Sequence, residues 1–179
     1  YFLKKKYKKD AMTYIIKTYG WDRVRYDIED HTTPHHLVTV EDLEEVYKAE
    51  INRPLTYYEQ LDIMATILFT KYKGFGCIDT LREQNVDGIN IGTSGSIISS
   101  FLDVDSDLPK APRSIWIYYD GKYIHLDFLT TYTEEEMRRI ILLICMYNNP
   151  GSLTEKRGYM VNTMYDKTRV LAIRPGAGE

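Results

Sequence analysis

The hydrophobic pattern of this chain changes its period near residue 86, and that change limits the fold more than any other feature. Before residue 86, apolar residues recur every three or four positions, whereas after it they mostly alternate with polar residues. Spacing of three or four indicates helices with one buried face, and alternation indicates strands. Helices followed by strands predict an α+β protein, in which a mainly antiparallel sheet has one further helix packed on it.

Two helices are predicted before residue 52. Apolar residues at helical spacing run from Leu3 to Thr18, and Gly20 ends the pattern. Residues 29–38 predict a linker. Thr39 then acts as the N-cap of a second helix that stops at Asn52 and Pro54, because a Thr side chain can accept hydrogen bonds from the free N–H groups of a first turn.

The third helix has the clearest start. Thr56 and Glu59 have the spacing of a capping box, and Gly74 is expected to end the helix in a left-handed turn. Its apolar stripe consists of Leu61, Met64, Ala65, Leu68, Phe69 and Tyr72.

The second half predicts strands. Residues 86–91 alternate, and residues 115–128 form two alternating runs around Asp120-Gly121, a dipeptide that favours a type I′ hairpin turn. A helix follows Thr133, and two strands at 160–165 and 169–174 end the pattern. We divide the chain into an N-terminal helix and linker (1–38), a helical part (39–85) and a sheet part (86–179).

Several clusters contain residue types that occur in functional sites, but each fits a loop or the core better than a catalytic centre. The glycine-rich stretch 92–96 lacks the lysine of a phosphate-binding loop. Zinc needs three or four ligands fixed by the fold, whereas the adjacent histidines point apart in an extended linker. The alternate aspartates lack the Gly and Glu of a calcium loop. The two cysteines lie far apart without CxxC spacing, so free thiols are expected. These residues are His31, His35, His36, Asp103, Asp105, Asp107, Cys77 and Cys145.

The bulk properties exclude other classes. The 179 residues carry a net charge of −3, which is unlike a general nucleic-acid-binding protein. The longest apolar run, Ile140 to Met146, is too short to cross a membrane. The chain begins at Tyr1 rather than Met, so we expect it to be part of a longer protein.

Three arginines lie in or near the predicted last sheet, at Arg157, Arg169 and Arg174. An arginine just after a turn can present its planar guanidinium group to a phosphate, although the residues alone favour an exposed strand arginine that covers apolar surface.

The order of these features resembles the N-terminal region of CpaF-like ATPases, which belong to the traffic ATPases of type II and type IV secretion. The resemblance covers residues 40–175. It depends on residues 55–60 before the third helix, on Gly74-Phe75-Gly76 after it, on 86–92, on the hairpin at 114–122, and on 160–170. Residues 93–113 stand as an insertion relative to the family.

This resemblance implies a hexameric ATPase at the cytoplasmic face of the cell membrane, assembling pili or exporting proteins. Its RecA-like core, which binds ATP and Mg, would lie outside this chain, which is expected to be inactive by itself. Arg169 matches the family arginine that reaches the nucleotide phosphates. The implied partners are the RecA-like domain, neighbouring subunits and inner-membrane platform proteins, without direct nucleic-acid contacts.

Two alternatives remain open. The chain can be a stand-alone protein-interaction module that uses its acidic helix at 40–51 or its tyrosine-rich sheet. It can also be an enzyme with an unrecognised site.

Overall fold

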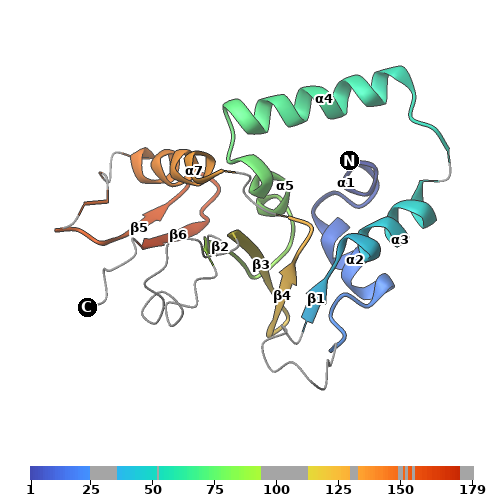
Figure 1. The fold of residues 1–179 in the computed structure, drawn as a ribbon, viewed down its shortest axis with the longest axis horizontal. Coiled ribbons are helices and arrows are strands. Elements are labelled where there is room, and N and C mark those ends of the chain that lie inside the picture. Colours follow the sequence, from blue (N-terminus) through green and yellow to red (C-terminus); the bar gives the residue numbers. More distant parts are fainter. Residues whose placement is uncertain are drawn as a thin grey trace, which may run out of the picture.

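The computed structural model describes residues 1–24, 36–51, 53–93, 113–129, 133–148, 151, 153–154 and 156–173. The described helices and strands form an α+β fold, as the sequence predicts. N-terminal helices lie beside a four-stranded sheet with the order β1-β4-β3-β2, and a separate two-stranded hairpin, β5-β6, lies at the other end of the molecule with helix α7 (Figure 1).

The predicted first helix is broken in two. Helices α1 (Phe2–Tyr7) and α2 (Ala11–Tyr19) are separated by a 3-10 turn, where Lys8 has a φ of 53°. The Gln84 side chain accepts a hydrogen bond from the Met12 N–H at 3.1 Å, and the Asn85 N–H donates to the Lys9 carbonyl at 2.8 Å. These partners are more than seventy residues away, so the helical spacing could not reveal the break. Gly20 ends α2 in the left-handed conformation, as predicted.

The prediction of a linker at 29–38 is wrong for its last three residues. Strand β1 (His36–Val38) pairs in parallel with β4, and Leu37 lies opposite His125. Three residues are too few for a recognisable alternation, and the parallel partner lies far along the chain. Helix α3 (Val40–Glu50) follows Thr39 with a capping box, which confirms the predicted N-cap.

Helix α4 (Tyr57–Tyr72) begins as predicted, because the Thr56 and Glu59 capping box is present. Its end differs from the prediction: Lys73 caps it with a φ of −123°, and the left-handed residue is Gly76 rather than Gly74. The larger difference concerns its apolar stripe, since no residue of α4 is buried. Figure 1 shows this helix along one edge of the molecule.

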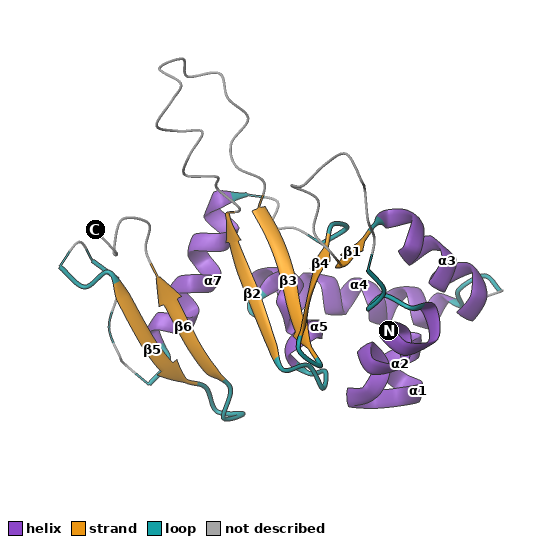
Figure 2. Ribbon diagram, turned by 90° about the horizontal axis from the view of Figure 1, so that it is seen from below, coloured by secondary structure: helices purple, strands orange, loops and turns teal. Residues whose placement is uncertain are grey.

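A 3-10 turn (Gly76–Ile78) and the short helix α5 (Asp79–Arg82) lead from α4 into the sheet. Strand β2 (Gly88–Thr93) pairs antiparallel with β3 (Arg113–Tyr119), which pairs antiparallel with β4 (Lys122–Leu126) (Figure 2). Asp120 and Gly121 have φ values of 50° and 72°, which confirms the type I′ turn.

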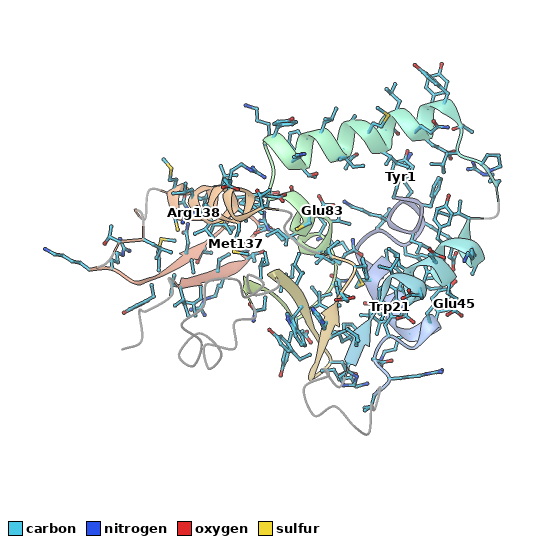
Figure 3. The ribbon with its side chains drawn as sticks, in the orientation of Figure 1. Tyr1, Trp21, Glu45, Glu83, Met137 and Arg138 are labelled. Atoms are coloured by element: carbon cyan, nitrogen blue, oxygen red, sulfur yellow. The ribbon has the colours of Figure 1, made fainter. Side chains whose placement is uncertain are left out.

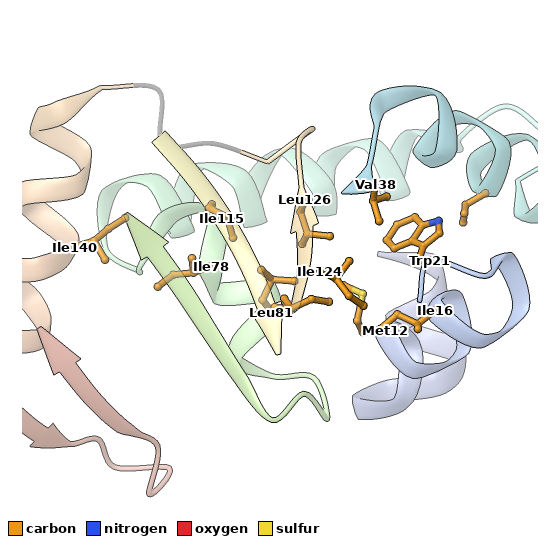
Figure 4. Close-up of a cluster of buried hydrophobic side chains, with 12 residues drawn as sticks. Met12, Ile16, Trp21, Val38, Ile78, Leu81, Ile115, Ile124, Leu126 and Ile140 are labelled. Atoms are coloured by element: carbon orange, nitrogen blue, oxygen red, sulfur yellow. The ribbon is translucent and has the colours of Figure 1, made fainter. Parts of the chain in front are cut away.

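One hydrophobic cluster contains residues from all three predicted parts of the chain, 1–38, 39–85 and 86–179. The division into these parts stays a prediction. Apolar side chains of β3 and β4 contact the N-terminal helices on one side and α5 and α7 on the other (Figure 4). The central members are Met12, Ile16, Trp21, Val38, Val46, Ile78, Leu81, Ile115, Ile117, Ile124, Leu126 and Ile140.

Helix α7 (Glu134–Met146) and the strands β5 (Tyr159–Thr163) and β6 (Arg169–Ile173) confirm the last predicted elements. The Thr133 side chain caps α7 by accepting a hydrogen bond from the Glu136 N–H. The side chain of Asn162 on β5 donates to the carbonyls of Ile144 and Tyr147 at 2.8 and 2.9 Å. The hairpin is therefore bonded directly to the C-terminal end of α7.

Candidate functional site

Arg169, the residue that the sequence singled out, lies at the start of β6 immediately after the turn of the hairpin. It pairs with Thr163 of β5, and it is exposed. The turn itself is tight, because Lys167 adopts a φ of 66° and the Asp166 side chain accepts a hydrogen bond from the Thr168 N–H at 3.0 Å. The backbone thus fixes the position of Arg169 at the edge of the hairpin.

Arg169 shares one face of the hairpin with apolar side chains. Alternate residues of a strand lie on the same face, and the cross-strand pairs on this face are Tyr159 with Ile173, Val161 with Leu171, and Thr163 with Arg169. The four apolar members are between 53% and 64% exposed. We call this surface the hairpin face: an apolar patch with one arginine at its end.

The opposite face of the hairpin holds it to the rest of the molecule. Met160 and Asn162 are buried there. A second attachment comes from the turn, where Asp166 accepts a hydrogen bond from the Arg82 guanidinium group at 2.7 Å. Arg82 lies on α5 and also lies over the ring of Phe75, 4.4 Å from the ring centroid. The hairpin face is thereby held in a fixed orientation relative to the sheet.

A cavity of about 550 Å³ lies beside the hairpin turn. Its lining includes Lys4, Lys8, Lys9 and Arg82. Glu83 pairs with Lys4, and Asp166 pairs with Arg82, so two of the four cations are neutralised. The cavity can attract an anion weakly, but it does not contain Arg169 in its lining.

A larger cavity of about 740 Å³ lies between the N-terminal helices, α3, α4 and the sheet. Its lining is mostly apolar and includes Trp21 and Gln84. The Nε1 atom of Trp21 and the Nε2 atom of Gln84 are buried without a hydrogen-bond partner. Such donors can anchor an acceptor group in an otherwise apolar space.

The other arginines are not brought together with Arg169. Arg157 lies in the loop before β5 rather than in the sheet, where its backbone exchanges hydrogen bonds with Thr154. It precedes the end of the hairpin at which Tyr159 pairs with Ile173, whereas Arg169 lies at the other end. Arg174 lies outside the described residues.

The remaining sequence candidates offer no reactive centre in the described part of the chain. His36 lies in β1, with its Nδ1 3.2 Å from the Arg23 carbonyl oxygen. His31, His35, the glycine-rich residues 94–96 and Asp103, Asp105 and Asp107 lie outside the described residues. Both cysteines are free, as predicted. Burial, and secondarily Glu136, raise the pKa of the Cys77 thiol to about 11, so its thiolate is scarce near neutrality.

The described residues contain neither a cluster of metal-ligating side chains nor a membrane-spanning helix. No group of three or more His, Cys, Asp or Glu side chains could hold a metal ion. Nor does any helix in these ranges have the length and apolarity that crossing a membrane requires.

Sequence reasoning located Arg169 but missed the apolar surface that accompanies it. The signal was present: Tyr159, Val161, Leu171 and Ile173 alternate with the residues that face α7, so both faces of this hairpin are apolar. One apolar face of the hairpin packs against α7, so the apolar character of the other face indicates contact with a further protein surface.

In comparisons with known proteins, no protein-family model and no curated protein matches the chain. The fold and the hairpin face define an α+β protein with an exposed arginine on an apolar patch.

Proposed function

We propose that this chain is the N-terminal regulatory and oligomerisation domain of a hexameric secretion or pilus-assembly ATPase. In this proposal it moves relative to a RecA-like ATPase core that lies outside the chain. The support is the order of its elements: a long helix, a turn with two glycines, a strand, a hairpin, a helix, and a final hairpin that begins its second strand with Arg169. This order agrees with the resemblance found in the sequence.

The hairpin face is the observation that carries the proposal. Its four exposed apolar side chains provide a surface for a neighbouring domain, because apolar patches of this kind are normally covered in the assembled protein. Arg169 lies at the end of that patch, where its guanidinium group can bind a phosphate held by the docked domain. The chain would hold the RecA-like core through the apolar patch and ATP through the arginine.

The residues of this chain would contribute one contact to ATP binding, and the core would carry out hydrolysis. Arg169 would form charge-assisted hydrogen bonds with the terminal phosphate of ATP, and hydrolysis would remove that contact. Mg would be held by the core together with the phosphates of ATP. The partners would be the core, neighbouring subunits and inner-membrane platform proteins, and the assembly would lie on the cytoplasmic face of the membrane.

The reading frame that encodes the chain gives the first test. We expect a GxxxxGK[ST] motif downstream of residue 179, because the core must supply the phosphate-binding loop. A reading frame without that motif contradicts the proposal.

ATP hydrolysis by the complete product of that reading frame gives the second test. A hydrogen bond to a charged group contributes about 1.5–3 kcal/mol, so Arg169→Ala should lower kcat/KM for ATP roughly tenfold to a hundredfold. Arg169→Lys should recover part of the loss. Lys156→Ala, which removes an exposed charge before β5, should change little. An unchanged kcat/KM in Arg169→Ala would refute the role given to Arg169.

The second candidate function is a stand-alone interaction module without ATPase activity. The exposed apolar side of α4 favours it, because that surface requires no nucleotide to bind a partner. Absence of a downstream ATPase motif would select this alternative.

A further inference from the structure

Helix α4 presents its most apolar side to solvent and a mixed side, which includes Ile63, to the protein. At 100° per residue, Glu59, Ile63 and Thr70 lie on one side, and they are the least exposed residues of the helix. The opposite side carries seven large apolar side chains that are between 49% and 77% exposed. They are Tyr57, Tyr58, Leu61, Met64, Leu68, Phe69 and Tyr72.

Polar contacts hold α4 in this orientation. Glu59 accepts two hydrogen bonds from the Arg53 guanidinium group at 2.9 and 2.7 Å. Asp62 accepts one from the Tyr1 hydroxyl group at 2.6 Å, and Tyr1 lies beside α4 in Figure 3. At the other end, Arg139 of α7 donates to the carbonyl oxygen of Gly74 at 2.7 Å. A rotation that turned the apolar side into the adjacent cavity would break these contacts.

Six positions along the middle of the apolar side of α4 have the same spacing in both directions, and Tyr58 and Phe69 flank them. Tyr57, Leu61, Met64, Ala65, Leu68 and Tyr72 are separated by 4, 3, 1, 3 and 4 residues. The residue types also match, with tyrosines at the two ends and leucines next to them. A surface with this symmetry is complementary to itself when a second copy approaches in the opposite direction.

We propose that α4 is the contact surface of a homodimer, in which two copies of the helix pack antiparallel about a two-fold axis between Met64 and Ala65. In this register Tyr57 of one copy faces Tyr72 of the other, and Leu61 faces Leu68. Such pairs bury apolar side chains on both copies in equivalent environments, as an isologous interface requires.

The charged residues of α4 fit the same register. Residues whose numbers add up to 129 lie at the same height along the two helices. Glu59 and Asp62 are bonded to Arg53 and Tyr1 of their own chain, away from the contact. Lys71 faces Tyr58, and an ammonium group over a tyrosine ring is attractive. No two like charges of α4 are opposed, so the register carries no electrostatic penalty.

The exposed area is sufficient for a contact between proteins. A fully exposed aromatic side chain offers about 150–250 Å². The four aromatic residues of this side are 64–77% exposed and together offer on the order of 500 Å² before the aliphatic residues are added. A standard interface buries about 800 Å² on each partner, which the whole side approaches. This two-fold contact goes beyond the proposed function, because ring formation needs a different, head-to-tail interface.

Molar mass in solution tests the proposal. We expect the 179-residue chain to be a dimer in sedimentation and light-scattering measurements at concentrations up to roughly 100 μM. Leu61→Glu and Leu68→Lys should each give a monomer, because either substitution places one charge from each copy in the apolar contact. The double variant should restore the dimer, since the new Glu then faces the new Lys of the other copy.

The controls separate dimerisation from folding. Both leucines are about half exposed, so far-ultraviolet circular dichroism of the single variants should match that of the wild type. Thr66→Lys, on the opposite side and four residues after Asp62, should remain dimeric. A monomeric wild type at every concentration, or a double variant that stays monomeric, would overturn the proposal.

Cysteine cross-linking tests the register. In a Cys77→Ser background, Ala65→Cys should form a disulfide-linked dimer, whereas buried Cys145 should not react. Tyr57→Cys alone should not cross-link, because residue 57 of each copy lies roughly 22 Å from residue 57 of the other along antiparallel helices. Tyr57→Cys combined with Tyr72→Cys should cross-link. A dimer linked by Tyr57→Cys alone would indicate parallel helices and refute the antiparallel register.

Discussion

Gly74 and Gly76 bracket the turn after α4, and each excludes a side chain for a different reason. A Cβ atom on Gly74 would lie 2.0 Å from Oδ2 of Asp79, which accepts a hydrogen bond from the Phe75 N–H at 2.7 Å. Gly76 has a φ of +62°, and a Cβ atom there would lie 2.7 Å from Oε1 of Glu136. The turn thus requires close approach at one glycine and a left-handed backbone at the other.

Replacing Gly76 should destabilise the protein more than replacing a glycine that needs only the left-handed conformation. Gly76→Ala combines backbone strain with displacement of the Glu136 carboxylate and a tight contact, 3.3 Å, with Cδ1 of buried Ile140, so we expect a loss of about 1.5–3 kcal/mol in the free energy of unfolding. Gly121→Ala provides the comparison, because Gly121 has a φ of +72° but no atom within 4 Å of its added Cβ. That variant should lose about 1 kcal/mol. Urea denaturation measures both, and equal losses would show that the clash with Glu136 is relieved at no cost.

At the scale of the elements, the sequence predicted the starts of helices and the position of the hairpin turn. These predictions depend on contacts between residues no more than four positions apart. Thr39, Thr56 and Thr133 cap their helices, and Asp120-Gly121 forms the expected turn. Each depends on hydrogen bonds or backbone angles that the nearby sequence determines. These signals therefore hold before any tertiary contact is known.

Contacts between distant residues could not be predicted in this way. The break after α1 depends on Gln84 and Asn85, and β1 depends on its pairing with β4. The sequence predicted the apolar stripe of α4 correctly. Its spacing does not determine whether the stripe packs against the core of the same chain or against another protein. Arg169 was placed correctly after a turn, whereas its apolar neighbours on the hairpin face depend on the pairing of β5 with β6.

The first turn of α4 should be sensitive to acid. Arg53 and the Thr56 N–H lower the pKa of Glu59 from 4.5 to about 2. A carboxyl group with a lowered pKa in the folded state stabilises the protein above its unfolded pKa, and the contribution is lost as pH falls towards the folded pKa. The difference in stability between wild type and Glu59→Gln should therefore be largest above pH 5 and should shrink between about pH 4.5 and pH 2.

Urea denaturation followed by circular dichroism at several pH values measures that difference. Arg53→Ala removes the main cause of the lowered pKa, so Glu59→Gln in that background should show a smaller dependence on pH. A difference that stays constant from pH 6 to pH 2.5 would contradict the role assigned to Glu59.

At the scale of the whole molecule, the hairpin face keeps its orientation through a few contacts between distant parts. The pair between Arg82 and Asp166 is the most enclosed of these, since the two side chains are 12% and 30% exposed. A partly buried charge that loses its partner keeps its desolvation cost, unlike one at the surface. This pair therefore links the position of Arg169 to the stability of α5.

Asp166→Asn should destabilise the protein by about 1–2 kcal/mol and should increase amide hydrogen exchange in β5 and β6. Glu44→Gln is the matched control, because its pair with Lys48 is exposed on both sides and should contribute little. Mass spectrometry of exchanged peptides measures the local effect, and unchanged exchange in the hairpin of Asp166→Asn would show that other contacts hold it.

The parallel pairing of β1 with β4 has a consequence for synthesis of the chain. Leu37 and His125 are register partners, and 88 residues separate them. At about 5–20 residues per second, a ribosome needs roughly 4–18 s to add that segment. During this interval the nascent chain carries Ile16, Trp21 and Val38 without β4, so the apolar cluster of the N-terminal helices cannot be completed until most of the chain has been made.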